Sequence, residues 1–195
     1  MPSIVICEKA SQANNVREAV GSRYGEVLAA SGHLLRLATP EEINPDWKVW
    51  SFDLLRPESG FYPMREDREG MGGRSGKTLD RIKAALATAD KVIIATDCDR
   101  EGQAIGENLL RFYKFKGEVL RAMFSNEDKD TLQKAFAAAK PNTEYLPLYN
   151  SAIARVQADQ IANFTATRTV TIALKPAHMK GVLRTSGLVS SLDFA

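Results

Sequence analysis

Four carboxylate residues in this sequence stand where they could hold a divalent cation. They are Glu8, Asp97, Asp99 and Glu101. The first follows the apolar run at residues 3–7, and the other three follow a second apolar run at residues 91–96. Short continuous apolar runs are typical of buried strands in parallel sheets. Because parallel strands end at the same edge of a sheet, where open α/β folds place ligands, we expect these carboxylates to converge.

Converging carboxylates repel one another unless a cation neutralises them. Oxygen ligands suit Mg²⁺, which proteins commonly hold through one or two carboxylates while it keeps waters for a phosphate partner. The sequence therefore predicts Mg²⁺ as the cofactor. Strand alternation is expected to point Asp97 and Asp99 to one side and Cys98 to the other. The alternative is a solvated acidic loop that caps a helix beginning near Arg100, since aspartate is favoured at helix starts.

The elements that must position these carboxylates alternate in a pattern that predicts an α/β fold, a parallel sheet flanked by helices. After the first strand we expect a helix over residues 11–31, and then a loop over 33–67 whose large aromatic residues pack. Ile105, Leu109 and Leu110 predict a helix directly after the acidic run. The other expected elements are a loop at 68–77, a helix from Thr78, a strand at 119–123, a helix capped by the Ser125 and Asp128 pair, and a long helix at 148–165.

Composition excludes several classes of protein. The 195 residues are 44% hydrophobic and carry a net charge of only +2, which excludes a mainly disordered chain. No apolar stretch approaches the roughly 18 residues that span a bilayer, and Glu8 comes too early for a signal peptide. Two cysteines, Cys7 and Cys98, cannot form a disulfide framework, so the cytoplasm is the expected location. Both are expected to be small buried core residues.

The glycine-rich segment at residues 72–78 superficially resembles a nucleotide-binding phosphate loop. Met71 stands where such a loop has its first glycine, and no apolar strand precedes the segment. We interpret the segment as a flexible basic loop that leads into a helix. No ATP is expected as a partner.

The motifs around the carboxylates resemble a Toprim domain, and more narrowly the N-terminal part of a type IA DNA topoisomerase of the bacterial topoisomerase III branch. Glu8-Lys9 and the run from Asp97 to Ile105 carry the resemblance. Further matching segments are 32–35, 47–51, 125–128, 148–149, 154–159 and 163–168. The resemblance implies a Rossmann-like Toprim domain over residues 1–145. Residues 146–195 would begin a helical DNA-binding core domain, cut short in this chain.

The resemblance also implies roles for the residues near the scissile phosphate. Glu8 is expected to act as general acid or base, and Asp97, Asp99 and Glu101 to hold Mg²⁺. Lys9 and Arg168 would contact phosphates, where a transition state with extra negative charge needs cations.

Three further residues are expected at the DNA. Arg100 would order the acidic loop by ion pairing, and His33 and Arg155 are candidate DNA contacts. The alternative for Arg155 is a surface ion pair with Asp159, four residues away on a helix. Two positions depart from the family pattern. Gln103 replaces a usual glutamate, which removes an acidic group from the outer shell of the metal, and the segment 186–190 lacks a usual arginine that would bind the strand.

No tyrosine of this chain carries the motif of the family's nucleophile, which lies in a separate downstream domain. The first hypothesis is therefore the metal-binding part of a type IA topoisomerase, inactive in relaxation alone. It would act on single-stranded DNA with the remaining domains of the enzyme, away from any membrane, at the nucleoid. The second is a stand-alone Toprim nuclease or primase-like enzyme that uses a metal-activated water. The third is a non-catalytic nucleic-acid-binding module.

Overall fold

A computed structural model describes residues 2–183 of the chain and divides it into two compact units. Unit 1 comprises residues 1–36 and 66–152, and unit 2 comprises residues 37–65 and 153–195, each described below within residues 2–183. The segment 186–190, where the sequence lacks the usual arginine, lies outside the described residues. So does the rest of residues 184–195, the last part of the predicted core domain.

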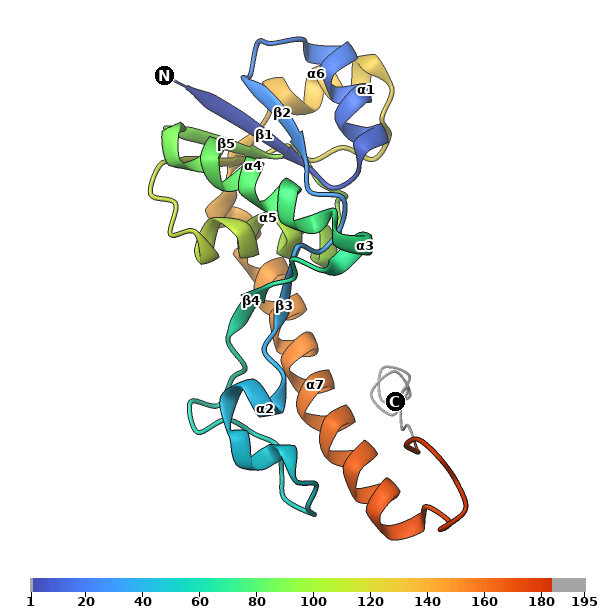
Figure 1. Cartoon of the computed structure of the whole chain (residues 1–195). Helices are drawn as coiled ribbons and strands as arrows, with labels where there is room; N and C mark the ends of the chain where they lie inside the picture. The colour runs from blue at the N-terminus through green and yellow to red at the C-terminus, as the bar shows by residue number, and fades with distance from the viewer. Residues whose placement is uncertain (1, 184–195) are drawn as a thin grey trace. The chain divides into compact units, whose positions relative to one another are not determined.

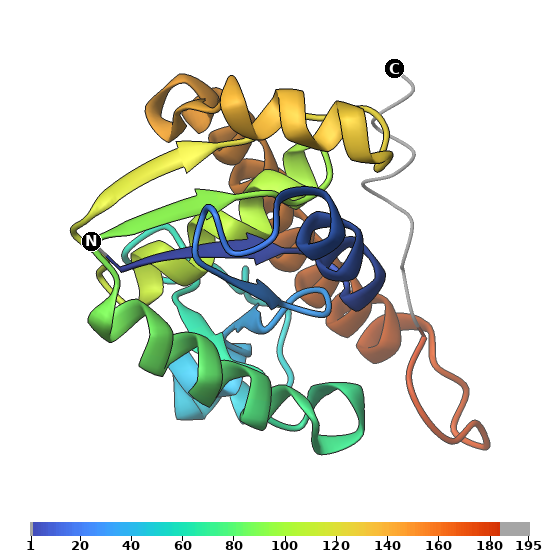
Figure 2. The same ribbon diagram turned by 90° about the horizontal axis from the view of Figure 1, so that it is seen from above.

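Unit 1 is built on a five-stranded sheet in the order β2-β1-β5-β6-β7. The strands are β1 (Ser3–Cys7), β2 (Glu26–Ala29), β5 (Lys91–Ile94), β6 (Glu118–Arg121) and β7 (Lys140–Pro141). The first four are parallel, as Figure 2 shows for the arrows of β1, β5 and β6, whereas β7 is antiparallel to β6. The predicted parallel α/β sheet is therefore confirmed, with one short antiparallel strand added at its edge.

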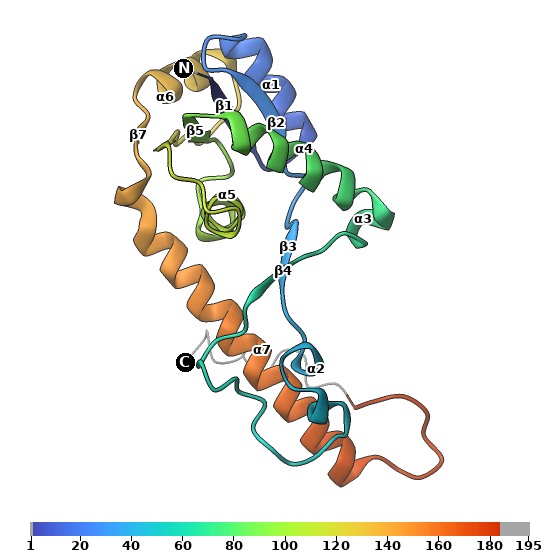
Figure 3. The ribbon, with the colours of Figure 1, turned by 60° about the vertical axis from the view of Figure 1, so that its left-hand side comes forward.

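Helices cover both faces of this sheet (Figures 1 and 3). On one face lie α1 (Ala10–Val20) and α6 (Lys129–Ala137), whose Val16 and Phe136 share a buried cluster with Val5 of β1. On the other lie α4 (Ser75–Thr88) and α5 (Arg100–Phe112). Gly106 of α5 approaches the side chain of Ile94 so closely that an added Cβ would stand 2.7 Å from it. Both faces are thus buried, which explains the continuous apolar strands.

The predicted helix over residues 11–31 is wrong in its second half, because α1 ends at Val20 and residues 26–29 form the strand β2. Gly21 follows the helix with φ +58° and ψ −139°, a conformation that favours glycine, and its N–H donates to the Arg17 carbonyl at the end of the helix. At Gly25 (φ +96°) an added Cβ would stand 1.8 Å from the Ser3 carbonyl oxygen. These two glycines turn the chain back so that β2 pairs with β1.

The predicted loop at 33–67 contains regular elements: β3 (Leu35–Leu37), which pairs with β4 (Met64–Glu66), the helix α2 (Pro40–Ile43) and the 3-10 helix η1 (Pro45–Lys48). The expectation that its aromatic residues pack is wrong for Trp50, Phe52 and Phe61, which are exposed. Tyr62 is the buried aromatic residue instead, because Gln157 accepts a hydrogen bond from its backbone N–H (2.8 Å) and its hydroxyl donates to the Leu55 carbonyl (2.7 Å).

Several other boundaries differ from the sequence-based predictions. The segment 68–77 is not a loop throughout, since it contains the short helix α3 (Gly70–Gly73), and α4 begins at Ser75 rather than Thr78. Asp128 alone caps α6, accepting from the backbone N–H of Thr131 (2.9 Å), so the predicted pairing with Ser125 is wrong. After the 3-10 helix η2 (Asn142–Tyr145), α7 spans Leu146–Leu174 and exceeds the predicted helix at both ends. Across residues 2–183, no helix combines the length and the apolarity that a membrane crossing requires.

Candidate functional site

Glu8 and Asp97 meet at the carboxyl edge of the sheet because β1 and β5 are paired neighbours. The register aligns Ile6 with Ile94, so both chains leave the sheet at the same level. The carboxyl group of Glu8 is close enough to Asp97 for the backbone N–H of Asp97 to act on it. The negative charges of Asp97 and Asp99 both reach Glu8, the part of the predicted convergence that the structure supports.

The pKa of Glu8 is raised above its ordinary value. Burial is the largest cause, and the negative charge of Asp97 is the next, with Asp99 contributing in the same direction. The Asp97 backbone N–H and the Lys9 ammonium oppose the shift without cancelling it. A carboxyl group that keeps its proton at higher pH is suited to donate that proton to a departing oxygen.

Asp99 forms the N-cap of α5. Its Oδ1 accepts from the backbone N–H of Gly102 at 2.7 Å, and Thr96 Oγ1 donates to the Gly102 carbonyl at 2.7 Å. Gly102 cannot be larger, because an added Cβ would stand 2.2 Å from the Asp97 carbonyl oxygen. The capping alternative raised for this acidic loop is therefore confirmed for Asp99, and it leaves Oδ2 of the same carboxylate outside that hydrogen bond.

Arg121, a buried residue that the sequence analysis did not single out, supports the backbone of the acidic loop. Arg121 of β6 is 1% exposed and donates to the carbonyls of Thr96 (3.0 Å) and Asp97 (2.6 Å), and also to those of Ile94 and Ala122 (both 3.2 Å). Burial lowers its pKa, and the charges of Asp97 and Asp99 act against that shift. Arg121 therefore holds the backbone of the acidic loop, in addition to the ion pairing that the sequence predicts for Arg100.

Gln12 of α1 links the carboxylates and was also missed. It is fully buried, accepts from the backbone N–H of Glu8 (2.8 Å), and donates to Asp97 Oδ1 (2.8 Å) and Glu127 Oε1 (3.2 Å). Glu127 in turn accepts from Asn15 Nδ2 at 2.7 Å, which adds a carboxylate to the four that the sequence analysis named. The available signal was a glutamine on the otherwise apolar face that α1 turns to the sheet.

The charged residues around this centre are more exposed. Lys9 Nζ lies 3.5 Å from Asp97 Oδ2 and 4.0 Å from Glu127 Oε1. Glu101 projects from the first turn of α5 and lies 4.0 Å from His33 Nε2 and 3.7 Å from Arg100 Nε. The structure therefore brings His33 and Arg100 close to Glu101 in the first turn of α5.

The side chains of the two cysteines and of Gln103 have structural surroundings. Cys7 is buried as predicted, and burial raises its pKa to about 12. Cys98 is exposed, so its prediction as a core residue is wrong, although its Sγ does turn to Phe124, donating to the carbonyl at 2.8 Å. Gln103 is fully buried and donates to Asn142 Oδ1 at 2.7 Å. Position 103 therefore contributes to the interior of unit 1.

The donor set at this edge fits a hydrated magnesium ion. Among residues 2–183, no three His, Cys, Asp or Glu side chains are gathered closely enough to form a ready-made metal cage. Mg²⁺ needs only one or two carboxylates and keeps several waters. The negative charges of Asp97 and Asp99 both act on Glu8, and a cation would reduce this repulsion. Asp97 and Asp99 are the two carboxylates that can provide the oxygen ligands.

Arg155 and Arg168 both lie on the part of α7 that belongs to unit 2. Arg155 Nε is 3.8 Å from Asp159 Oδ2, which confirms the surface pair raised as an alternative. Arg168 is 3% exposed, donates to the Glu41 carboxylate and the Trp47 carbonyl, and lies 5.3 Å from the Trp50 ring centroid. A cleft of about 340 Å³ opens beside it.

The fold and the acidic edge define a class of protein. A Toprim domain has a parallel sheet with helices on both faces. A glutamate follows one central strand, and an Asp-x-Asp loop follows the neighbouring strand. The family model of the Toprim domain matches residues 3–127, and the chain belongs to this family.

Individual relatives narrow the comparison. The chain is 31% identical to DNA topoisomerase 3 of Bacillus cereus over 87% of its own length and 24% of that protein. It is 31% identical to DNA topoisomerase 3 of Staphylococcus haemolyticus (88% and 25%) and 30% identical to DNA topoisomerase 1 of Alkalihalophilus pseudofirmus (88% and 26%). These matches fit the Toprim-containing part of a type IA DNA topoisomerase, and the chain spans about a quarter of the length of these relatives.

A solved structure shows the same fold. Full-length topoisomerase I from Thermotoga maritima superposes with a TM-score of 0.64 at 20% identity, covering 86% of this chain and 26% of that one. The predicted fold class is confirmed by this similarity. The segment that carries a catalytic tyrosine in the family is not covered by this chain.

Proposed function

We propose that this chain is the Mg²⁺-binding part of a type IA DNA topoisomerase, which cleaves and rejoins single DNA strands with the help of a tyrosine outside the chain. The observation that carries the proposal is the carboxyl edge itself, where Asp97 and Asp99 converge on a Glu8 whose pKa is raised. The similarity to proteins named DNA topoisomerase supports the same reaction class.

Each residue of the edge has a proposed role in the cleavage step. The tyrosine, after loss of its hydroxyl proton to solvent water, bonds through its oxygen to phosphorus while the bond to the departing deoxyribose oxygen breaks, and Glu8 gives its proton to that departing oxygen. Lys9, half exposed beside Asp97, provides a cation to the phosphate oxygens. Asp97 and Asp99, with Glu101 nearby, would hold a Mg²⁺ ion, which would supply further positive charge at the phosphate.

Gln12 and Arg121 act as positioning residues in this proposal. Gln12 fixes the orientation of the Asp97 carboxylate through a hydrogen bond to Oδ1, and Arg121 fixes the backbone of the same residue. Catalytic groups need such support because a displacement of 1 Å can cost about two orders of magnitude in rate.

Basic residues of each unit are separately proposed to contact DNA. His33 and Arg100 border the acidic edge at Glu101, and Arg155 and Arg168 belong to α7. Residues 1–145 are proposed to form the Toprim domain, and residues 146–195 are proposed to begin the DNA-binding core domain. Arg168 would have to exchange its contact with Glu41 for a phosphate to act there.

A chimera tests the proposal. This chain replaces the matching quarter of Bacillus cereus DNA topoisomerase 3, and the product is incubated with negatively supercoiled plasmid and Mg²⁺. We expect relaxation by the chimera, loss with Asp97→Asn or Glu8→Gln, and retention with Asp130→Asn, a change to an acidic residue in the first turn of α6 outside the site. The isolated chain should leave the plasmid supercoiled. Nicked circles from the isolated chain, lost with Asp97→Asn, would instead establish a metal-dependent nuclease.

A further inference from the structure

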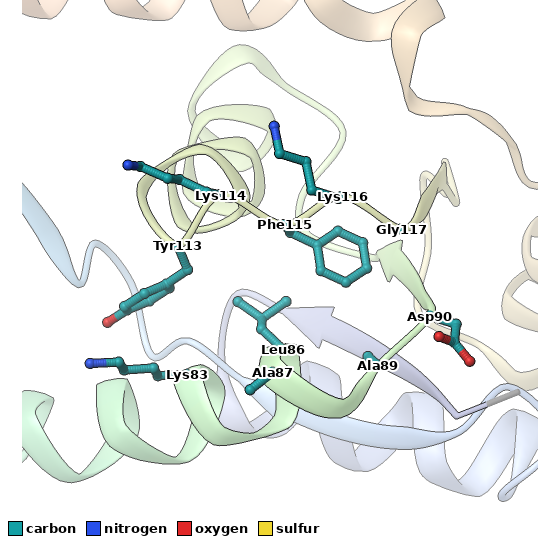
Figure 4. Close-up of a pocket in the computed structure, with 10 residues that line it drawn as sticks. All are labelled: Lys83, Leu86, Ala87, Ala89, Asp90, Tyr113, Lys114, Phe115, Lys116 and Gly117. Atoms are coloured by element: carbon teal, nitrogen blue, oxygen red, sulfur yellow. The ribbon is translucent and has the colours of Figure 1, made fainter.

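A second feature of unit 1 lies at the opposite, amino edge of the sheet. Asp90 immediately precedes β5 and Gly117 immediately precedes β6, and both border a cleft of about 570 Å³ (Figure 4). We call this the amino-edge cleft; the side chains that define it are Lys83, Leu86, Tyr113, Lys114, Phe115 and Lys116. Its volume is within the range of about 300–1,000 Å³ typical of ligand clefts.

The cleft combines an apolar floor with a basic rim. Figure 4 shows Leu86 and Phe115 facing each other across it, with Lys83 beside the ring of Tyr113. Lys83 Nζ lies 6.0 Å from that ring centroid. Lys114 and Lys116 extend away from the floor. Phe115 is only partly buried, so part of the residue is accessible to a ligand.

The three lysines are not neutralised by neighbouring acids. Over the described stretch 2–183, none of Lys83, Lys114 and Lys116 forms an ion pair within 4.0 Å. Asp90 is the one acidic residue lining the cleft, which leaves an excess of two positive charges. Glu66 lies near Lys83 but is already hydrogen-bonded to Arg68 (2.7 Å) and Tyr113 (3.0 Å).

The loop that presents two of these lysines is held in one conformation. The backbone N–H of Phe115 donates to the Leu110 carbonyl (2.9 Å) and that of Lys114 to the Arg111 carbonyl (3.1 Å), the hydrogen bonds of a Schellman motif. Lys114 occupies its left-handed position at φ +55°, where glycine is the usual residue. A lysine at this position costs conformational energy, and the fold alone gives no reason to prefer it.

A second cleft on the other side of the same loop extends the basic surface. Its volume is about 480 Å³, and it shares Lys114, Phe115, Lys116 and Gly117 with the amino-edge cleft. Gly117 allows this arrangement, because an added Cβ would stand 2.2 Å from the Asp90 carbonyl and 2.5 Å from the Phe115 ring. A ligand longer than one residue could therefore follow the loop from one cleft to the other.

We propose that the amino-edge cleft binds single-stranded nucleic acid, with phosphates at Lys83, Lys114 and Lys116 and a base against Phe115. Alternating cations and exposed ring faces are the chemistry that recognises a flexible strand with unstacked bases. The choice of a nucleic acid as the polyanion rests on the proposed function. The site itself is separate from the carboxyl edge, so it would hold a strand away from the cleavage centre.

Fluorescence anisotropy with a labelled oligothymidylate of twelve nucleotides tests this site, in 0.1 M salt and EDTA. Counterion release gives a salt slope of about 0.7 for each phosphate contact on a single strand, which corresponds to about 5-fold in affinity per lysine at 0.1 M salt. Lys114→Gly with Lys116→Gln should therefore weaken binding about 25-fold and reduce the slope by about 1.4. Phe115→Leu should weaken binding about tenfold with an unchanged slope.

The matched control is Lys129→Gln with Lys134→Gln, which removes two exposed charges from α6. It should keep the parent's affinity within about twofold. Parental affinity in the Lys114/Lys116 variant, an equal loss in the α6 control, or equal binding of free thymidine monophosphate would each overturn the proposed strand site. Thermal unfolding verifies that the Lys114/Lys116 variant is folded.

The failure of this site and the failure of the proposed function are distinguishable. Relaxation by the chimera together with parental binding in the Lys114/Lys116 variant would overturn the strand site alone. Loss of binding in that variant together with an inactive chimera would overturn the proposed function alone.

Discussion

Replacement of Arg121 by methionine should unfold the acidic loop more readily than any other single change at this site. The guanidinium donates to four backbone carbonyls, and one of these, the Ile94 carbonyl, keeps a second donor in the Ala122 N–H (3.0 Å). The carbonyls of Thr96 and Asp97 lose a charged donor in the variant. Each charge-assisted hydrogen bond contributes about 1.5–3 kcal/mol, and the variant no longer has to bury a charge, which offsets part of the loss. We therefore expect the free energy of unfolding to fall by about 3–5 kcal/mol.

The assay is urea unfolding followed by circular dichroism, with hydrogen exchange of peptides from β5 and α5 as the local measurement. Trp47 and Trp50 both belong to unit 2, so their fluorescence follows that unit separately. Arg121→Lys keeps the charge with fewer donors and should lose about half as much. A loss below about 1 kcal/mol for Arg121→Met, or unchanged exchange in β5, would refute the reasoning that this arginine holds the loop.

Three further predictions concern single positions in unit 1. Gly102→Ala should lower the free energy of unfolding in urea by about 2–3 kcal/mol, because its Cβ would displace Asp97. A variant as stable as the parent would contradict that packing. Lys114→Gly should raise the melting temperature by about 2–4 °C, since it relieves a left-handed lysine; a lower melting temperature would show that the lysine itself supports the turn. The hydrogen bond from Arg68, followed by that from Tyr113, lowers the pKa of Glu66 in the folded state. Glu66 therefore stabilises the fold above pH 4.5, and this contribution is lost as the pH falls through its folded pKa. Glu66→Gln should accordingly flatten the acid limb of a stability–pH curve, and an unchanged limb would contradict the assignment.

The sequence predicted the centre of the site because apolar strands and the residues directly after them are local patterns. The runs before Glu8 and Asp97 were sufficient to place both residues at one sheet edge, as the pairing of β1 with β5 confirms. The helix after Asp99 was equally predictable, since its cap and its apolar face lie in one short segment.

The supporting residues depend on tertiary contacts that periodicity does not encode. The sequence indicates only an ordinary strand residue at Arg121. A buried arginine needs partners, and its partners here are backbone carbonyls of another segment, which the sequence pattern does not reveal. Gln12 contacts Asp97, 85 residues away along the chain. The strand β2 was hidden for a different reason: two glycine turns, not a change in hydrophobic pattern, separate it from α1.

The most direct test of the central claim is a Mn²⁺ titration monitored by electron paramagnetic resonance, with Mn²⁺ as a probe that Mg²⁺ can displace. The account predicts bound Mn²⁺ in the parent chain and in Asp130→Asn, and its loss when Asp97→Asn and Asp99→Asn are combined. Unchanged Mn²⁺ binding in the Asp97/Asp99 variant would contradict the assignment of the carboxyl edge as the metal site.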